Sequence, residues 1–325
     1  MEKSILIRMD DIRSENQKFF AKFPEANKIW DELKDIIKVY LGGQLALAAQ
    51  RMYDLCFSDI SKIATSFLDE DRVLFRMRNS GDKFDEFSQD EMYHIPFEKN
   101  YLVSNARFSI SGYPSLYLGA SSYVCWEELG RPTLENVTLA IFRIKQYIKV
   151  IDLTYKKKQE IHNPLKHCLY LASTIPVLYK DAPFKPEYII PQLLLQGLVN
   201  YKKSNPTKST DYAIKYTSTH YNDRNLWFGD ADGLLNRFTN YVFAPISFQE
   251  KGTSSYLKNL LECVTCTNYN RFRLCKERGI DENSDKPLCR YGLSAFGRME
   301  KELKDQASNM LTYNGKEKGM LTSLI

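Results

Sequence analysis

The spacing of the apolar residues changes near residue 72 and divides the chain into two regions. Over residues 26–41 the apolar positions recur every three or four residues, which is the pattern of one buried helix face. Gly42 and Gly43 interrupt the pattern as a helix C-terminus does, and a second helical run covers residues 45–67. We therefore expect residues 1–70 to form an N-terminal helical module that contains a helical hairpin.

Beyond residue 72, short apolar runs typical of strands are mixed irregularly with helical runs. Ser121 or Ser122 is the expected N-cap of one of these helices. Because there is no regular strand–helix–strand repeat, the pattern predicts an α+β fold. The expected strands cover residues 73–78, 116–118, 136–145, 150–155, 211–217 and 241–246, and the expected helices cover residues 121–129, 165–171 and 187–201.

Composition narrows the class of protein. With 43% hydrophobic residues and a formal net charge of +5, the chain has neither the composition of a disordered protein nor the basic surface of a typical nucleic-acid binder. The N-terminus has three consecutive apolar residues, and no segment approaches the length of a membrane span, so we expect neither a secretory signal nor a membrane anchor. Seven cysteines, an odd number at irregular spacing, favour a reducing compartment. We expect a cytoplasmic protein.

Several common catalytic motifs are missing. The sequence has no glycine-rich dinucleotide or P-loop motif, no His-Glu-x-x-His pair and no Gly-x-Ser-x-Gly elbow. It has four histidines, which leaves few candidates for a His-based triad. Dehydrogenase, P-loop and zinc-protease functions are therefore disfavoured.

The candidate functional residues lie between residues 76 and 132. Arg76 follows three apolar residues of a predicted strand, where a surface salt bridge is the simpler interpretation. Arg107 and Phe108 join a cation to an aromatic face just before a Gly-Tyr-Pro turn. Glu127 and Glu128 end the predicted helix over 121–129, and either of them is a candidate acidic residue.

The order of these residues resembles the longer type of RES domain, a family named for an Arg, a Glu and a Ser. The resemblance covers about residues 74–246, and Asn105 and Ala106 stand where many members have Gly before the second Arg. It is carried by Phe75-Arg76, Arg107-Phe108-Ser109, Gly112, Pro114, Leu116-Tyr117, Glu128 and the strand Ala213-Ile214-Lys215-Tyr216-Thr217-Ser218.

The resemblance implies an ADP-ribosyltransferase-like RES domain over residues 71–250, acting as a toxin that cleaves the nicotinamide–ribose bond of NAD by hydrolysis or phosphorolysis. It implies catalytic roles for Arg76, Glu128 and Ser218, with Arg107 and Phe108 as substrate-binding residues. The Glu128 assignment is preferred to Glu127 by register. NAD is then a substrate, no cofactor is required, and a separate antitoxin protein is the expected partner.

The chemistry of the reaction agrees with these residue types. Nicotinamide leaves as a neutral molecule from a cationic pyridinium, so one carboxylate is enough to stabilise the ribose cation, whereas ordinary glycosidases need two. The arginine fork matches the oxygens of a pyrophosphate better than lysine does, which favours Arg76 with support from Arg107. The flat ring of Phe108 suits a stacking contact, although such a residue also packs in cores. Ser218 has the alternative role of bonding to the backbone.

The C-terminal segment, residues 251–325, contains four of the seven cysteines, namely Cys263, Cys266, Cys275 and Cys289. Their arrangement is a C-x2-C pair followed by two widely spaced residues, which is compatible with a structural zinc site but is not the paired pattern of a zinc ribbon, so unlinked thiols are favoured. The alternative functions are an ADP-ribosyltransferase that modifies a macromolecule and a non-enzymatic, zinc-supported binding module. A homo-oligomer is compatible with the sequence.

Overall fold

The computed structural model describes residues 4–80, 87–154, 161–206, 210–219, 237–268 and 295–313. The chain folds into two compact units, and each is built from segments that are far apart in sequence. The first unit contains Met1–Phe67, Lys99–Ser115 and Lys149–Tyr216, and the second contains Leu68–Glu98, Leu116–Ile148 and Thr217–Ile325.

These units differ from the predicted division at residues 70 and 250, because the apolar faces of the N-terminal helices are buried within the first unit against later helices. The functional domain boundaries themselves stay a prediction. The α+β class is confirmed, since both helices and strands build the chain.

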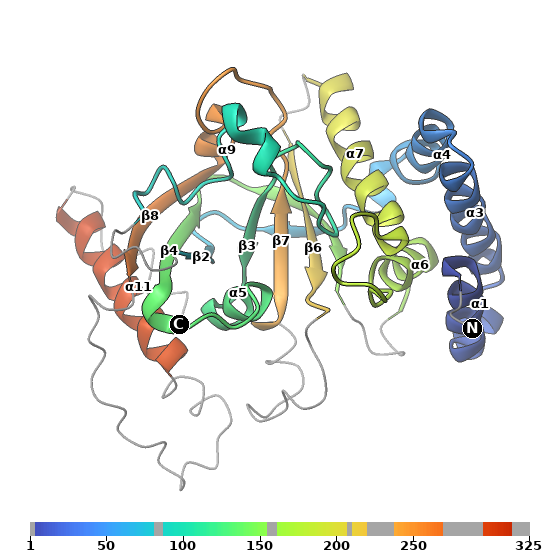
Figure 1. Cartoon of the computed structure of the whole chain (residues 1–325), viewed down its shortest axis with the longest axis horizontal. Helices are drawn as coiled ribbons and strands as arrows, with labels where there is room; N and C mark the ends of the chain where they lie inside the picture. Colours follow the sequence, from blue (N-terminus) through green and yellow to red (C-terminus); the bar gives the residue numbers. More distant parts are fainter. Residues whose placement is uncertain are drawn as a thin grey trace, which may run out of the picture. The chain divides into compact units, whose positions relative to one another are not determined.

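The first unit is mainly helical, and it contains the predicted hairpin (Figure 1). Pro24 occupies the first turn of α3, where its missing N–H costs nothing, and Gly43 follows α3 with φ of 82°. The helices are α1 (Ile5–Glu15), α2 (Gln17–Lys22), α3 (Pro24–Leu41), α4 (Leu45–Phe57), α6 (Pro164–Ser173) and α7 (Ile189–Ser204), with short 3-10 turns η1 (Ile60–Lys62) and η5 (Pro186–Tyr188).

The second predicted helix of the hairpin is shorter than expected. It ends at Phe57 instead of continuing to Phe67. The Asp59 carboxylate accepts hydrogen bonds from the backbone N–H and the hydroxyl of Ser61, at 3.2 and 2.5 Å, and so stabilises a local turn in place of another helical turn. The chain then enters β1 (Ser66–Leu68).

Gly197 lets α7 approach α4 closely. A Cβ added at Gly197 would lie 2.3 Å from the ring of Phe57, which is fully buried. We expect Gly197→Ala to lower the free energy of unfolding by about 1–3 kcal/mol through overpacking, more than the ~1 kcal/mol that alanine gains in helix propensity. Chemical denaturation measures this change. Adding Phe57→Leu should recover part of the loss, and purely additive effects of the two substitutions would contradict the assigned contact.

Within each unit the strands are hydrogen-bonded to one another in a continuous series. In the first unit the hydrogen-bonded order is β1-β5-β6, and in the second it is β7-β3-β2-β4-β8. The four pairings of the second unit are all antiparallel. The bounds are β2 (Val73–Asn79), β3 (Leu116–Gly119), β4 (Val137–Ile144), β5 (Ile148–Leu153), β6 (Asp211–Thr217), β7 (Thr239–Phe243) and β8 (Leu261–Asn268), so each predicted strand is confirmed.

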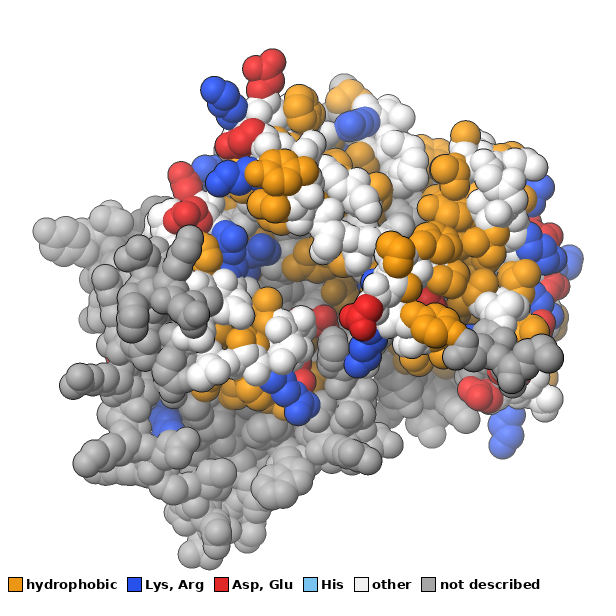
Figure 2. Space-filling view, viewed as in Figure 1, with side chains coloured by type: hydrophobic (Ala, Val, Ile, Leu, Met, Phe, Trp, Pro, Cys, Tyr) orange, Lys and Arg blue, Asp and Glu red, His pale blue; other side chains and the backbone are white. Residues whose placement is uncertain are grey.

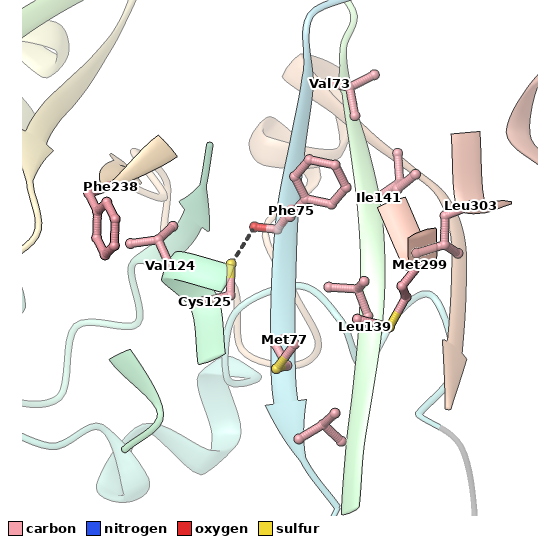
Figure 3. Packing of buried hydrophobic residues seen from close by; sticks show 11 residues of the cluster. Val73, Phe75, Met77, Val124, Cys125, Leu139, Ile141, Phe238, Met299 and Leu303 are labelled. Carbon is pink, nitrogen blue, oxygen red and sulfur yellow. Dashed lines mark hydrogen bonds between the residues drawn. The ribbon is translucent and has the colours of Figure 1, made fainter. Parts of the chain in front are cut away.

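The core of the second unit lies between its strands and two helices, α5 (Ser122–Glu128) and α11 (Ala295–Tyr313). Alternate residues of β2 point into this core, as the period of a strand requires. Figure 3 shows Val124 and Cys125 of α5 beside Phe75, where the Cys125 thiol donates to the Phe75 carbonyl at 3.3 Å. The remaining short elements are α9 (Ser255–Leu260), η2 (Phe97–Leu102) and η3 (Leu134–Asn136).

The first unit keeps several large apolar side chains exposed, and hydrophobic side chains gather over its helices in Figure 2. Tyr40, near the end of α3, stacks on Phe184 with ring centroids 6.3 Å apart, which places Phe184 beside the α3–α4 turn. A search of the described helices finds none with the length and apolarity needed to span a membrane. Among these exposed residues are Leu41, Leu45, Leu47, Leu178, Tyr179 and Phe184.

Candidate functional site

Two side chains from distant parts of the second unit donate hydrogen bonds to one carboxylate. Glu128 Oε1 accepts a hydrogen bond from Ser218 Oγ at 2.6 Å and another from Asn240 Nδ2 at 2.7 Å. Ser218 and Asn240 are buried, whereas Glu128 is exposed. The structure therefore brings together Glu128 and Ser218, two of the residues predicted from sequence, and adds Asn240, which the sequence analysis missed.

The fold positions each of these groups. Glu128 is the last residue of α5, Ser218 directly follows β6, and Asn240 lies in β7 opposite Gly119 of β3. Ser218 is fixed by its backbone N–H, which donates to the Phe238 carbonyl at 2.8 Å. Both donors are thus attached to ordered strands, and this limits the freedom of the carboxylate that they contact.

Local interactions also fix helix α5. Ser121, one of the two predicted candidates, is its N-cap, and its hydroxyl accepts from the Val124 N–H at 3.1 Å. Gly119 allows the helix to lie close to β3, because an added Cβ would come within 2.6 Å of Cys125 Sγ and of Val124. The helix therefore starts at a defined point, and Glu128 lies two turns later.

Glu127, the other candidate carboxylate, has a different environment. It is 2% exposed and its Oε2 accepts from Arg131 Nε at 2.8 Å. Burial, together with a hydrogen bond that the Tyr123 hydroxyl donates to Glu127, raises the pKa of Tyr123. These contacts give Glu127 a structural role within the fold, and they favour Glu128 as the carboxylate that meets a ligand.

Arg76 occupies the centre of β2, opposite Ala140 of β4. Its Nη1 donates to the Tyr117 carbonyl at 3.1 Å, whereas its Nε is buried without a hydrogen-bond partner among the described residues. Burial, followed by repulsion from Arg78, lowers the pKa of Arg76 to about 10, so the guanidinium stays protonated at neutral pH. Within the described part of the chain no carboxylate forms an ion pair with it, and it is not joined to Glu128 by a direct contact.

The charges of Arg76 and Glu128 act on one common neighbour. Burial raises the pKa of Cys125 to about 12, and a backbone hydrogen bond from Gly119 lowers it. Smaller opposite effects on the same thiol come from Arg76, which lowers its pKa, and from Glu128, which raises it. Both predicted catalytic charges are therefore near enough to Cys125 to influence its thiol.

Arg107 and Phe108 belong to the first unit. Arg107 is buried, and its Nη1 donates to the carbonyls of Ser173 and Ile175 at 2.7 and 3.0 Å. Phe108 is fully buried and packs on Tyr216, with ring centroids 4.7 Å apart. Through these contacts both residues contribute to the packing of the first unit. Their predicted contact with substrate stays a prediction.

His94 lies near Arg76 and is a structural histidine. Its Nδ1–H donates to the Ile95 carbonyl at 2.7 Å, and its Nε2 accepts from the Ser254 N–H at 2.8 Å, which fixes the neutral tautomer. Burial lowers its pKa to about 4, with smaller contributions from the positive charges of Arg76 and Lys258.

The shifted pKa of His94 predicts a pH-dependent stability. The unfolded chain binds the proton near pH 6.5 and the folded chain near pH 4, so the folded state is favoured above pH 6.5 and loses this advantage as the pH falls towards 4. The loss amounts to at most ~3 kcal/mol. Denaturation curves of the wild type and His94→Gln between pH 7 and 4.5 should converge at the acid end. A constant difference between them would contradict the assignment.

The described residues include no group of side chains arranged to hold a metal ion. Cys263 and Cys266 lie in β8, where burial raises the pKa of the Cys263 thiol and Cys266 Sγ contacts the Phe87 carbonyl at 3.1 Å. Cys275 and Cys289 lie outside the described residues, so the four-cysteine arrangement stays untested.

Comparison with known proteins gives one informative match. No family model matches the chain, and no solved structure gives a significant match. A Bacillus subtilis (strain 168) protein named "Putative toxin YopC" is 35% identical to this chain over 239 residues. The alignment covers 64% of this chain and 52% of that protein, so the chain spans about half the length of this curated relative.

Proposed function

We propose that this chain is an NAD-degrading toxin of the RES type, which cleaves the bond between nicotinamide and ribose. The observation that carries the proposal is the Glu128 carboxylate, exposed and held by Ser218 and Asn240. This grouping joins the Glu and the Ser of the family pattern across 90 residues of sequence.

The held carboxylate suits the charge that develops in this reaction. When the nicotinamide nitrogen leaves, it takes the electron pair of the bond to ribose C1′ and becomes neutral, and the ribose becomes cationic. A preorganised carboxylate stabilises that cation without having to reorient. Water or phosphate then forms the new bond to C1′, and attack by water releases a proton to solvent. No second carboxylate is required as a general acid.

Arg76 is the proposed group for the pyrophosphate of NAD. A guanidinium that is charged, partly buried and without an ion-pair partner in the described part of the chain retains attraction for an anion.

The name of the relative from Bacillus subtilis supports a toxic role, and we extend it to this chain as part of the proposal. A toxin that depletes NAD in its own cell requires neutralisation, so the proposal includes a separate antitoxin protein and action in the cytoplasm. Expression without that partner should stop growth and lower cellular NAD together. Growth arrest at constant NAD would favour another toxic activity.

The direct test is to incubate the purified protein with NAD and to follow free nicotinamide. Parallel reactions with and without inorganic phosphate identify the acceptor, because phosphorolysis yields ADP-ribose carrying an additional phosphate. Labelled ADP-ribose on a protein or nucleic acid would select the transferase alternative. Absence of nicotinamide release under all of these conditions would reject the proposed activity.

The two hydrogen-bond donors to Glu128 predict graded effects on turnover. We expect Ser218→Ala and Asn240→Ala each to lower kcat about tenfold, since each removes a hydrogen bond to a charged group worth roughly 1.5–3 kcal/mol. The double variant should lose less than the product of the two, because both act on one oxygen. Single variants with unchanged kcat would show that the donors do not position the carboxylate.

A further inference from the structure

The C-terminal helix α11 reaches the start of the helix that ends in Glu128. Glu300 of α11 is buried, and its Oε1 accepts from the backbone N–H of Ser122 at 2.7 Å and from the Ser122 hydroxyl at 2.8 Å. Ser122 is the first residue of α5 and is itself fully buried. A carboxylate from 178 residues further along the chain therefore occupies the N-terminus of α5.

Apolar contacts accompany this polar contact along the same two helices. Phe296 of α11 packs against Tyr123 and Trp126 of α5, with ring centroids 5.1 and 5.3 Å apart. Met299 and Leu303 share a core cluster with Val124 and Cys125, and Figure 3 shows the four side chains with β2 and β4. One turn of α11 on each side of Glu300 is thus packed, which limits the positions that its carboxylate can adopt.

The short helix α5 is consequently fixed at both ends. Ser218 and Asn240 hold the carboxylate at its C-terminal end, and Glu300 holds Ser122 at its N-terminal end. A negative charge is favourable at a helix N-terminus, where the backbone N–H groups lack partners within the helix. Because α5 is only seven residues long, a shift at its start moves Glu128 with it.

We propose that Glu300 is a positioning residue, which aligns α5 so that Glu128 meets the ribose in the reactive geometry. This inference rests on the proposed function, and it gives the segment beyond residue 250 a part in the reaction. The family resemblance ends near residue 246, so it assigns no role to Glu300.

The test compares Glu300→Ala with Glu300→Gln and with Glu302→Gln, which replaces an exposed carboxylate of the same helix. Glu300→Ala should lower kcat about ten- to a hundredfold with KM nearly unchanged, because a small misplacement of a reacting group has an effect of this size. Glu300→Gln keeps an oxygen that accepts from Ser122, so it should retain most of the wild-type kcat. Glu302→Gln should match the wild type.

Hydrogen–deuterium exchange gives a second measurement that does not depend on NAD turnover. In Glu300→Ala the Ser122 amide should exchange faster, while amides of β2 and β4 keep their wild-type rates. Wild-type exchange at Ser122, or faster exchange with unchanged kcat, would overturn the positioning role. If the wild-type protein releases no nicotinamide, the proposed function fails, and exchange alone decides whether Glu300 holds α5.

A milder variant covers the case in which Glu300→Ala does not fold. Ser122→Ala removes the hydroxyl donor but keeps the backbone N–H, so it weakens the contact without leaving a buried carboxylate unpaired. It should lower kcat by a few-fold and speed exchange at the start of α5. Wild-type behaviour in both measurements would also overturn the proposal.

Discussion

Glu128→Gln is expected to lower the rate of nicotinamide release about a hundredfold or more, which corresponds to about 2.7 kcal/mol of lost transition-state stabilisation. Glutamine keeps an oxygen that accepts from Ser218 and Asn240, so the side chain should stay in place. What is lost is the negative charge that stabilises the ribose cation. Steady-state kinetics should therefore show a lower kcat, with a smaller change in KM.

Glu127→Gln is the matched control, since it makes the same chemical change one residue earlier. Glu127 is buried and bonded to Arg131, so its replacement should affect stability more than turnover. A thermal unfolding curve of each variant separates the two effects. Full activity in Glu128→Gln together with inactivity in Glu127→Gln would reverse the assignment of the acidic residue.

Arg76→Ala is expected to lower kcat/KM for NAD about a hundredfold, mainly through a higher KM. The removed guanidinium is the proposed contact for the pyrophosphate, and a bond between charged groups in a partly buried place is worth several kcal/mol at most. Arg76→Lys should recover only part of the loss, because lysine keeps the charge but not the fork. Initial rates over a range of NAD concentrations give both constants.

Arg78→Ala provides the control for general loss of positive charge on β2. The Arg78 guanidinium lies 4.1 Å from the centre of the Phe87 ring and donates to the Glu91 carbonyl, contacts that belong to the fold. It should change kcat/KM much less than Arg76→Ala does. Equal losses in the two variants would mean that the strand supplies long-range attraction and that Arg76 makes no specific contact with NAD.

The elements that carry the candidate site were predictable because their signals are local. Three apolar residues before Arg76 indicate β2, and a serine before an apolar run indicates the start of α5. Glu128 and Ser218 were both assigned to the site from the order of residues in the RES pattern, and the structure brings these side chains together.

Contacts that depend on the register between distant strands could not be predicted, because no local sequence pattern indicates them. Asn240 faces Glu128 because β7 pairs with β3 and sets Asn240 opposite Gly119. In the sequence it is one polar residue at the start of an apolar strand. The choice of Glu300 over the exposed Glu302 likewise depends on which face of α11 is buried. The prediction for helix α4 was too long because the apolar spacing favours a continuing helix. In the structure the turn at Asp59 forms in its place.

The wide sequence separation of the groups around Glu128 has a consequence for synthesis of the protein on the ribosome. The carboxylate and its donor Asn240 are 112 residues apart, and the proposed anchor of α5 follows later still. Chains emerge from the N-terminus at roughly 5–20 residues per second, so a nascent chain lacks the complete arrangement for several seconds after Glu128 appears. The proposed activity therefore requires the segment that contains Glu300 to have emerged and folded before Glu128 is fully positioned.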